Sequence, residues 1–302
     1  MSGFRYNPPL VLDFDGSVLP VADSEIRVPL AGWQEAIRFG CSLKDYAALE
    51  THLRACLPQA HGPVYTGSGD YHHVSLFLLG ALAEKAGLGR DSLTVVVLDN
   101  HPDAMRYPFG LHCGSWAAHA CALSFVRHVH VVGICSPDIT LKHAWENRLG
   151  PFLRRRLTYW SIGKSAGWLR AIGRGDYARS FDGPDSLVER FLPVLHGADR
   201  VYLSIDKDVF SREELETDWD QGLFRFGHVR EVVEACAARL SGCDICGELS
   251  EPYSYQSRFK RLLSRLDGQS GNRRDGFERL RQRQRDCNSS LLALLRGMNG
   301  VS

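Results

Sequence analysis

The sequence of 302 residues lacks long apolar runs, an excess of charge of either sign and a regular spacing of cysteines. Its apolar stretches, such as 201–205, are far too short to cross a bilayer, and residues 1–9 contain no apolar core of a signal peptide. The net charge of +1 argues against a broad surface for nucleic acid. Nine scattered cysteines, an odd number, are typical of reduced thiols. We therefore expect a cytoplasmic protein with neither a nucleic-acid partner nor a membrane partner.

The overall composition is that of a globular protein with a large core, because 44% of the residues are hydrophobic and 24% are charged. Short apolar runs alternate with longer amphipathic stretches, which predicts an α/β fold: a three-layer α/β/α arrangement around a mostly parallel sheet. Strands are predicted at 10–13, 64–66, 94–98, 129–134, 157–161, 201–205 and 243–249, and helices at 43–56, 75–86, 115–125, 186–195 and 229–240. Several of these strands are continuously apolar, as expected for strands buried on both faces. The segment 149–185 carries glycines and basic residues and is predicted to be a surface excursion between strands.

The end of the sequence differs in composition from the rest. Between residues 258 and 285 there are ten Lys and Arg against three Asp and Glu, and four leucines follow at 291, 292, 294 and 295. We predict one domain over 1–256 and a basic C-terminal helical tail over 257–302. The leucines of this tail are expected to pack on the domain or on a neighbouring subunit, in preference to an anion-binding patch.

The most informative candidate motif for a functional site is Asp99-Asn-His101-Pro-Asp103, directly after the predicted strand 94–98. Open α/β sheets place their sites at the carboxyl ends of their strands. Two carboxylates and an imidazole at this spacing suit a divalent cation such as Mn²⁺, and Ni²⁺, Fe²⁺ or Zn²⁺ are alternatives. The string predicts a metal site at this edge.

Two further predicted strands end in ligand-type residues. The strand 201–205 runs into Asp206 and Asp208, and the strand 64–66 runs through a glycine-containing turn into His72 and His73, either of which is a candidate ligand. Parallel strands bring their carboxyl ends to one edge, so these residues are expected to meet those after 94–98. Together they supply enough ligands for two divalent ions.

In order along the chain, these strings are similar to the motifs of a known family. The chain resembles the ureohydrolases, which include arginase and agmatinase, as a divergent member over residues 60–255. The resemblance rests on five strings: GSGDYHH at 67–73, DNHPD at 99–103, GLHCG at 110–114, SIDKD at 204–208 and GELSEPY at 247–253.

The resemblance implies an arginase-like domain, a homo-oligomer and two divalent ions, Mn²⁺ above all. It implies metal ligands at His72, Asp99, His101, Asp103, Asp206 and Asp208. A metal-bridging hydroxide oriented by Asp208 would attack a C–N bond of a cationic guanidino or amidino compound, releasing urea or ammonia. His112 would protonate the leaving amine, and Glu248 would pair with the substrate cation. The short segment 103–112 lacks the Asn and Ser groups that hold an α-amino acid, so arginine itself is not the expected substrate.

Two other functions compete with this interpretation. The string Asp13-Phe-Asp15-Gly-Ser is similar to the nucleophile motif of haloacid-dehalogenase-type phosphatases, with Asp13 as nucleophile and Asp15 as acid and base. The other alternative is an arginase-fold protein that binds metal without catalysis. The pair Cys243 and Cys246 is not expected to form a zinc or redox site, because no second cysteine pair accompanies it.

Overall fold

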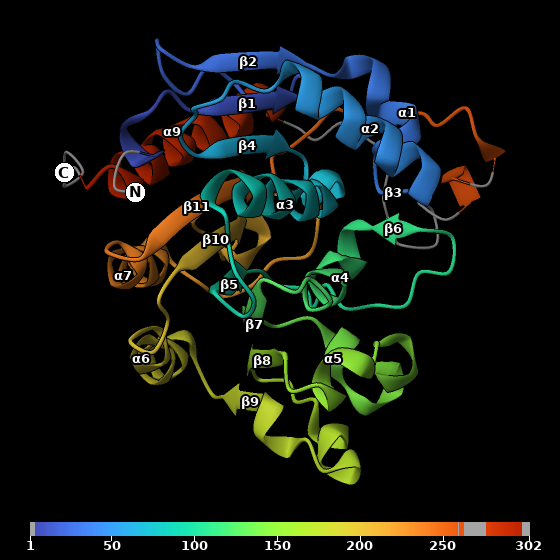
Figure 1. Cartoon of the computed structure of the whole chain (residues 1–302), viewed down its shortest axis with the longest axis vertical. Helices are drawn as coiled ribbons and strands as arrows, with labels where there is room; N and C mark the ends of the chain where they lie inside the picture. The colour runs from blue at the N-terminus through green and yellow to red at the C-terminus, as the bar shows by residue number, and fades with distance from the viewer. Residues whose placement is uncertain (1–3, 259, 263–275, 298–302) are drawn as a thin grey trace.

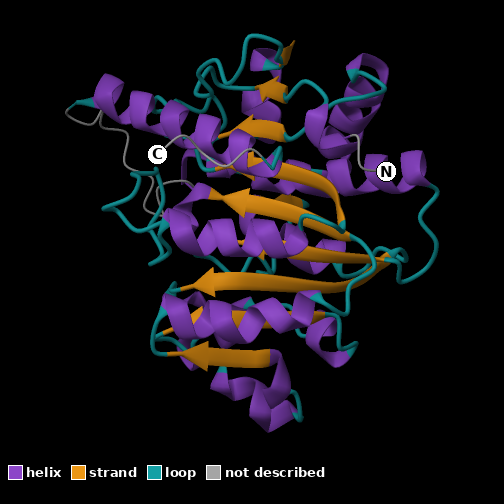
Figure 2. Ribbon diagram, turned by 90° about the vertical axis from the view of Figure 1, so that its left-hand side faces the viewer, coloured by secondary structure: helices purple, strands orange, loops and turns teal. Residues whose placement is uncertain are grey.

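A nine-stranded sheet runs through the computed structural model, which describes residues 4–258, 260–262 and 276–297 (Figures 1 and 2). Among the described residues, every strand pairing in this sheet is parallel. In spatial order the strands are β2 (Ile26–Pro29), β1 (Leu10–Asp13), β4 (Val64–Gly67), β11 (Leu240–Cys246), β10 (Val201–Asp206), β5 (Leu93–Leu98), β7 (Val126–Ile134), β8 (Leu157–Ile162) and β9 (Ala178–Phe181). A separate antiparallel pair joins β3 (Gly40–Cys41) to β6 (Leu111–His112).

Helices cover both faces of the sheet, so the three-layer α/β/α arrangement predicted from sequence is confirmed (Figure 2). One face carries α1 (Gln34–Ile37), α2 (Leu43–Cys56), α3 (Ser75–Ala86), α4 (Trp116–Ala120) and α5 (Gly150–Leu153). The other carries α6 (Pro184–Leu195), α7 (Phe226–Cys236) and α9 (Phe277–Leu295). Among the described residues, no helix combines the length and the apolar character needed to cross a membrane.

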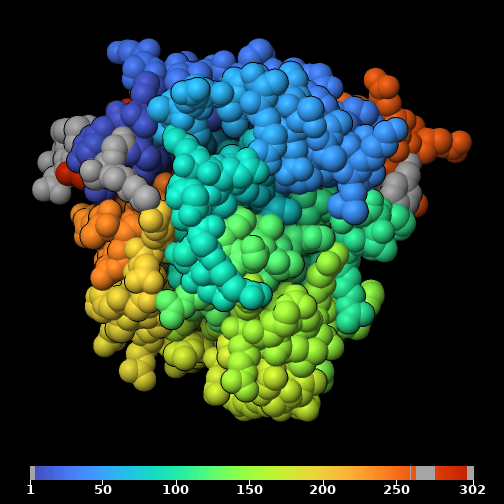
Figure 3. Space-filling view, viewed as in Figure 1, coloured from blue at the N-terminus to red at the C-terminus, as the bar shows by residue number. Residues whose placement is uncertain are grey.

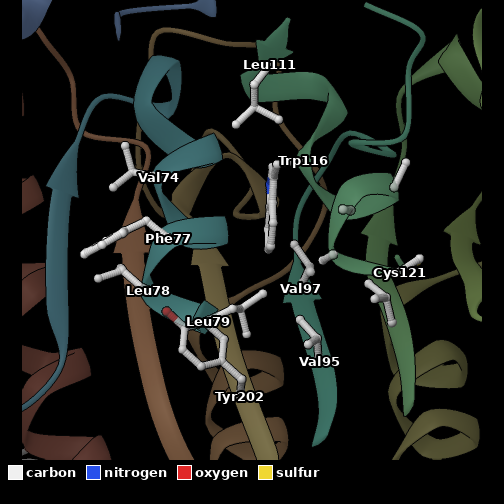
Figure 4. Close-up of a cluster of buried hydrophobic side chains, with 14 of the residues drawn as sticks. Val74, Phe77, Leu78, Leu79, Val95, Val97, Leu111, Trp116, Cys121 and Tyr202 are labelled. Atoms are coloured by element: carbon white, nitrogen blue, oxygen red, sulfur yellow. The ribbon is translucent and has the colours of Figure 1, made fainter. Parts of the chain in front are cut away.

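The central strands are buried on both faces because their successive side chains enter two different cores. In β5, Val95 and Val97 belong to the core beneath α3 and α4, whereas Val96 and Leu98 belong to the core beneath α6 and α7. Figure 4 shows Val97 near the ring of Trp116, and Val95 further along the same strand, in the first of these cores. This continuous apolar pattern is why the sequence identified the central strands correctly.

The edges of the sheet depart from the sequence prediction. The strands β2 and β9 were not predicted, because their half-exposed residues lack a continuous apolar run. The segment 149–185, expected as a surface excursion between strands, contains the predicted strand 157–161 as β8 and also the unpredicted β9, and it forms one end of the molecule in Figure 3. The strand β11 covers Leu240–Cys246 and not 243–249, so it ends three residues earlier than predicted.

The last described helix, α9, packs along the sheet on the side of α7 (Figure 1). Its residues Leu291, Leu292 and Leu295 are buried in the second core. The other parts of the predicted tail, 263–275 and 298–302, lie outside the described residues, and the division of the chain at residue 256 stays a prediction.

Candidate metal centre

Four neighbouring strands, β4, β11, β10 and β5, end at one place at the edge of the sheet. The three motifs that contain the predicted metal ligands lie at the ends of β4, β5 and β10. The short helices η3 (Gly69–Val74) and η9 (Lys207–Val209) form the turns after β4 and β10. Because these strands are parallel neighbours, residues more than a hundred positions apart in sequence meet here. The structure brings together all six predicted metal ligands: His72, Asp99, His101, Asp103, Asp206 and Asp208.

One half of the cluster surrounds the ring of His72. Its Nδ1 atom lies 3.0 Å from Asp103 Oδ2, 3.2 Å from Asp99 Oδ2 and 3.5 Å from Asp206 Oδ2. All four side chains are buried. Of the two histidines that the sequence left open, the structure thus places His72 among the carboxylates, whereas His73 belongs to none of the ligand groups found among the described residues.

A hydrogen-bonded chain behind the cluster fixes the orientation of His72. Its Nε2 atom lies 2.9 Å from Ser204 Oγ, and this hydroxyl donates a hydrogen bond to Asp244 Oδ1 at 2.7 Å. Ser204 must therefore accept a hydrogen bond from Nε2–H, which leaves Nδ1 without a proton in the neutral ring. The Nδ1 lone pair then points at the carboxylates, as a metal-binding imidazole requires.

The other half of the cluster is built around His101. Its Nδ1 atom lies 2.8 Å from Asp208 Oδ2 and 3.7 Å from Asp99 Oδ1. Backbone N–H groups hold both carboxylates in place: Asn100 donates to Asp208 at 2.9 Å and His101 donates to Asp99 at 2.6 Å. Asp99 therefore belongs to both halves and lies between the two candidate ion positions.

The four carboxylates of the cluster carry more negative charge than its two imidazoles can neutralise. Burial and the charge of Asp99 raise the pKa of Asp103 to about 7, and burial together with Asp206 and Asp99 raises the pKa of Asp208 well above its usual range. Four aspartates carry four negative charges when ionised, which two divalent cations would neutralise. The donor set and its unbalanced charge both fit a pair of hard or borderline cations.

Trp116 holds Asp103 in an unusual position and was not singled out by the sequence analysis as a site residue. The indole Nε1–H donates to Asp103 Oδ2 at 2.6 Å, and Asp103 has a backbone φ of +47°, in the left-handed region that non-glycine residues seldom adopt. The ring of Trp116 is itself fixed in the core (Figure 4). The core thus orients a ligand of the candidate site.

Cys246 is a second site residue that sequence reasoning missed. It is the last residue of β11, and its Sγ lies 3.1 Å from Asp206 Oδ2, close to His72. The sequence analysis considered Cys246 only together with Cys243 and found no second pair. Its position at a strand end beside the other motifs was the signal that could have identified it.

A cavity of about 430 Å³ opens onto the cluster and contains His112 in its lining. His112 ends β6, and its Nδ1 accepts a hydrogen bond of 3.0 Å from the backbone N–H of Gly114. Burial, with a smaller contribution from the charge of Lys260, lowers the pKa of His112 to about 3. His112 is therefore neutral at physiological pH, with its proton on Nε2.

Glu248, predicted to bind the substrate cation, does not line this cavity. Its carboxylate lies 2.5 Å from Lys207 Nζ and accepts a hydrogen bond of 2.6 Å from Asn288 of α9. The cause is the turn after β11: Gly247 has a φ of +85°, and a Cβ atom there would come within 2.4 Å of Asp206 Oδ1. The chain turns Glu248 toward α9, contrary to the expectation from sequence.

The aspartates of the phosphatase alternative lie apart from the cluster. Asp13 pairs with Arg27 at 3.0 Å, and Asp15 accepts a hydrogen bond of 2.5 Å from Ser17. Neither residue lines the cavity, and β4 and β11 separate β1 from the strand that carries Asp206. Among the described residues, Asp13 and Asp15 therefore share no site with the acidic residues at the end of β10.

Comparison with known proteins finds one curated relative and no matching family model. The relative is an uncharacterised protein of Thermotoga maritima, 27% identical over 193 residues, which are 64% of this chain and 60% of that protein. The match therefore spans less than two thirds of the relative's length.

Solved structures resemble the chain over nearly its whole length, at low sequence identity. A formimidoylglutamase from Bacillus subtilis matches with a TM-score of 0.55 at 14% identity, over 96% of this chain and 86% of the other. A proclavaminate amidino hydrolase from Streptomyces clavuligerus matches with a TM-score of 0.52 at 16% identity, over 97% and 93%. An arginase from Bacillus subtilis matches with a TM-score of 0.51 at 11% identity, over 98% of both chains. At these identities the likeness establishes the fold.

Proposed function

Because the chain has the three-layer fold of the ureohydrolases, we propose that it is a binuclear metal hydrolase that cleaves a C–N bond of a guanidino or amidino compound. The observation that carries this proposal is the shared position of Asp99 between two groups of metal-ligand atoms beneath one cavity. Fold alone would leave the chemistry open, because one fold hosts many functions. The ligand cluster supplies the chemical argument.

The cluster divides naturally into two ion positions. His72, Asp103 and Asp99 would hold the first ion, and His101, Asp208 and Asp99 the second. Asp206 lies beside the first position, with its Oδ2 atom 3.5 Å from His72 Nδ1. The ions, for which carboxylate and imidazole ligands favour Mn²⁺, would supply a water molecule activated near neutral pH. The protein's own contribution is to fix these ligands through Ser204, Trp116 and the backbone N–H groups described above.

His112 is the residue proposed for the proton step. It lines the cavity, and the hydrogen bond from Gly114 to Nδ1 keeps its proton on Nε2. In this neutral form Nε2–H can donate a hydrogen bond to the leaving nitrogen, and the proton that completes the leaving amine would come from the attacking water. We propose that His112 holds the leaving nitrogen through this hydrogen bond while the proton is transferred, and takes no part in holding the ions.

Replacement of His112 by asparagine should lower kcat by about 10²–10⁴-fold and leave the metal content unchanged. The pKa of about 3 also predicts that His112 keeps one charge state between pH 5 and 8. The pH profile of kcat/KM over this range should therefore have the same shape in the wild type and in His112→Asn. A limb near pH 6.5 that the variant loses would contradict the low pKa of His112, and loss of metal would contradict its role as a hydrogen-bond donor to the leaving nitrogen.

The charge of the cavity supports a cationic substrate. Besides the ligands, its lining includes the carboxylates of Asp138, Glu146 and Asp220, and none of the described residues that line it is Lys or Arg. Because Lys207 already neutralises Glu248, these acids are the remaining candidates to face a guanidinium or amidinium group.

The function is tested by metal analysis followed by a screen for urea and ammonia release over a panel of guanidines and amidines. We expect bound metal and release of one of the two products, both lost in Asp99→Asn. Bound metal without release from any compound would favour the inactive metal-binding protein. Release of phosphate from p-nitrophenyl phosphate instead, sensitive to Asp13→Asn, would favour the phosphatase.

The proposal also covers the location, the oligomeric state and the domain division of the protein. None of the nine cysteines, all of which lie in the described ranges, forms a disulfide, which supports a cytoplasmic location. A homo-oligomer, and a metallohydrolase domain over 1–256 followed by the tail 257–302, are proposed from the resemblance and from composition.

A further inference from the structure

The inner wall of the cluster contains a sulfur atom. Ligand atoms of Cys246, His72 and Asp206 all lie within 4.8 Å of one another. Cys246 is fully buried, and its Sγ approaches Asp206 Oδ2 at 3.1 Å. This group shares His72 with the carboxylate group of Asp99 and Asp103, so an ion bound at His72 has the thiol within reach.

The orientation of His72 selects the side on which the ion would bind. Its Nε2–H is occupied by Ser204, so the only lone pair available to an ion is that of Nδ1. The same Nδ1 faces Asp206 at 3.5 Å. Cys246 and Asp206 adjoin each other at the ends of the neighbouring strands β11 and β10, where their register pairs them directly. Nitrogen, oxygen and sulfur donors therefore converge on one position.

We propose that Cys246 is a ligand of the ion held by His72, and that this position takes a thiophilic divalent cation such as Zn²⁺. The position formed by Asp99, His101 and Asp208 contains no sulfur and takes a harder cation such as Mn²⁺. Thiolate ligands select zinc, whereas carboxylates suit manganese. The inference rests on the proposed binuclear centre and makes its two positions chemically different.

Binding replaces the proton of the thiol by the ion. The S–H bond of Cys246 breaks, a sulfur–metal bond forms, and the proton passes to solvent or buffer with no change of oxidation state. The pair Cys246 and Cys243 offers a matched control on one strand. The Sγ of Cys243 contacts the backbone oxygen of Asp244 and belongs to none of the ligand groups found among the described residues.

The test uses Co²⁺ as a spectroscopic substitute for Zn²⁺ in the full-length metal-free protein. The wild type and Cys243→Ala should show a near-ultraviolet thiolate-to-cobalt charge-transfer band, and Cys246→Ala should lack it. Cys246→Ala should also lower the affinity for Zn²⁺ by more than about tenfold, the smaller end of the losses seen even for outer-shell partners, and change the affinity for Mn²⁺ far less. A band that persists in Cys246→Ala, or that disappears in Cys243→Ala instead, would overturn the proposal.

A second measurement needs no variant. X-ray absorption of the zinc-loaded wild type should contain one sulfur scatterer at about 2.3 Å, whereas nitrogen and oxygen ligands alone would give distances near 2.0–2.2 Å and would overturn the inference. Binding of zinc and cobalt without any sulfur contact would leave the proposed hydrolase intact. A sulfur contact in a protein that releases neither urea nor ammonia would overturn the hydrolase and preserve the ligand assignment.

Discussion

Replacement of Asp99 by asparagine should remove both ions from the protein and abolish most of its activity. Asp99 is the residue common to the two ligand groups around His72 and His101, and the substitution keeps its shape while removing its charge. Loss of the ions removes a contribution of about 4 kcal/mol or more to transition-state stabilisation, which corresponds to about three decades in kcat/KM. Metal content per subunit after dialysis and kcat/KM on the same samples would measure both effects.

Two single-site variants are the controls for this prediction. Asp103 belongs only to the group around His72, and His101 only to the group around Asp208. Asp103→Asn and His101→Asn should each lower the metal content by about one ion, whereas Asp99→Asn should lower it by about two. Equal losses in all three variants would show that the cluster holds ions as one unit, and two retained ions in Asp99→Asn would refute the shared position.

Replacement of Lys207 by methionine should lower the free energy of unfolding by about 3–5 kcal/mol, the usual cost of breaking a buried ion pair. Lys207 is fully buried, and its ammonium group contacts Glu248 at 2.5 Å, Gln284 at 2.5 Å and Asn288 at 3.1 Å. Methionine fills a similar volume but leaves the Glu248 carboxylate buried without a cation. Urea denaturation of metal-free protein would measure the loss, since bound ions would add their own stabilisation.

The double variant Lys207→Met with Glu248→Gln separates the charge from the packing. Neutralising Glu248 removes the unpaired charge, so the double variant should recover most of the stability that Lys207→Met loses. Glu248→Gln alone should have little effect on KM, because Glu248 does not line the cavity. A large rise in KM in this single variant, with unchanged stability, would restore Glu248 to the substrate site.

The sequence was sufficient for those parts of the site that depend on strand ends. Asp99, His101, Asp206 and Asp208 follow continuously apolar strands, so their meeting at one edge follows from parallel pairing alone. The choice of His72 over His73 required the side-chain contacts with Ser204 and the carboxylates, which a string of letters does not contain.

The surroundings of Glu248 and Cys246 were not predicted because the residues that form them are distant in sequence. The direction of Glu248 depends on where β11 ends, on the turn at Gly247 and on contacts with a helix some forty residues later. Cys246 was compared only with Cys243, its neighbour in sequence, whereas its neighbours in space come from η3, after β4, and from β10. Pairings across the sheet, and not local patterns, decide both cases.

The contacts between α9 and Lys207 determine the order in which the candidate site is completed during synthesis on the ribosome. Every candidate ligand, from His72 to Cys246, is synthesised before Gln284 and Asn288, which complete the surroundings of the lysine between Asp206 and Asp208. Until Gln284 and Asn288 have been synthesised, the ammonium group of Lys207 lacks two of its hydrogen-bond partners. Domains begin to fold while their chains are still being made. We therefore expect Lys207, which stands between two candidate ligands, to gain its full set of hydrogen-bond partners only after α9 has been synthesised.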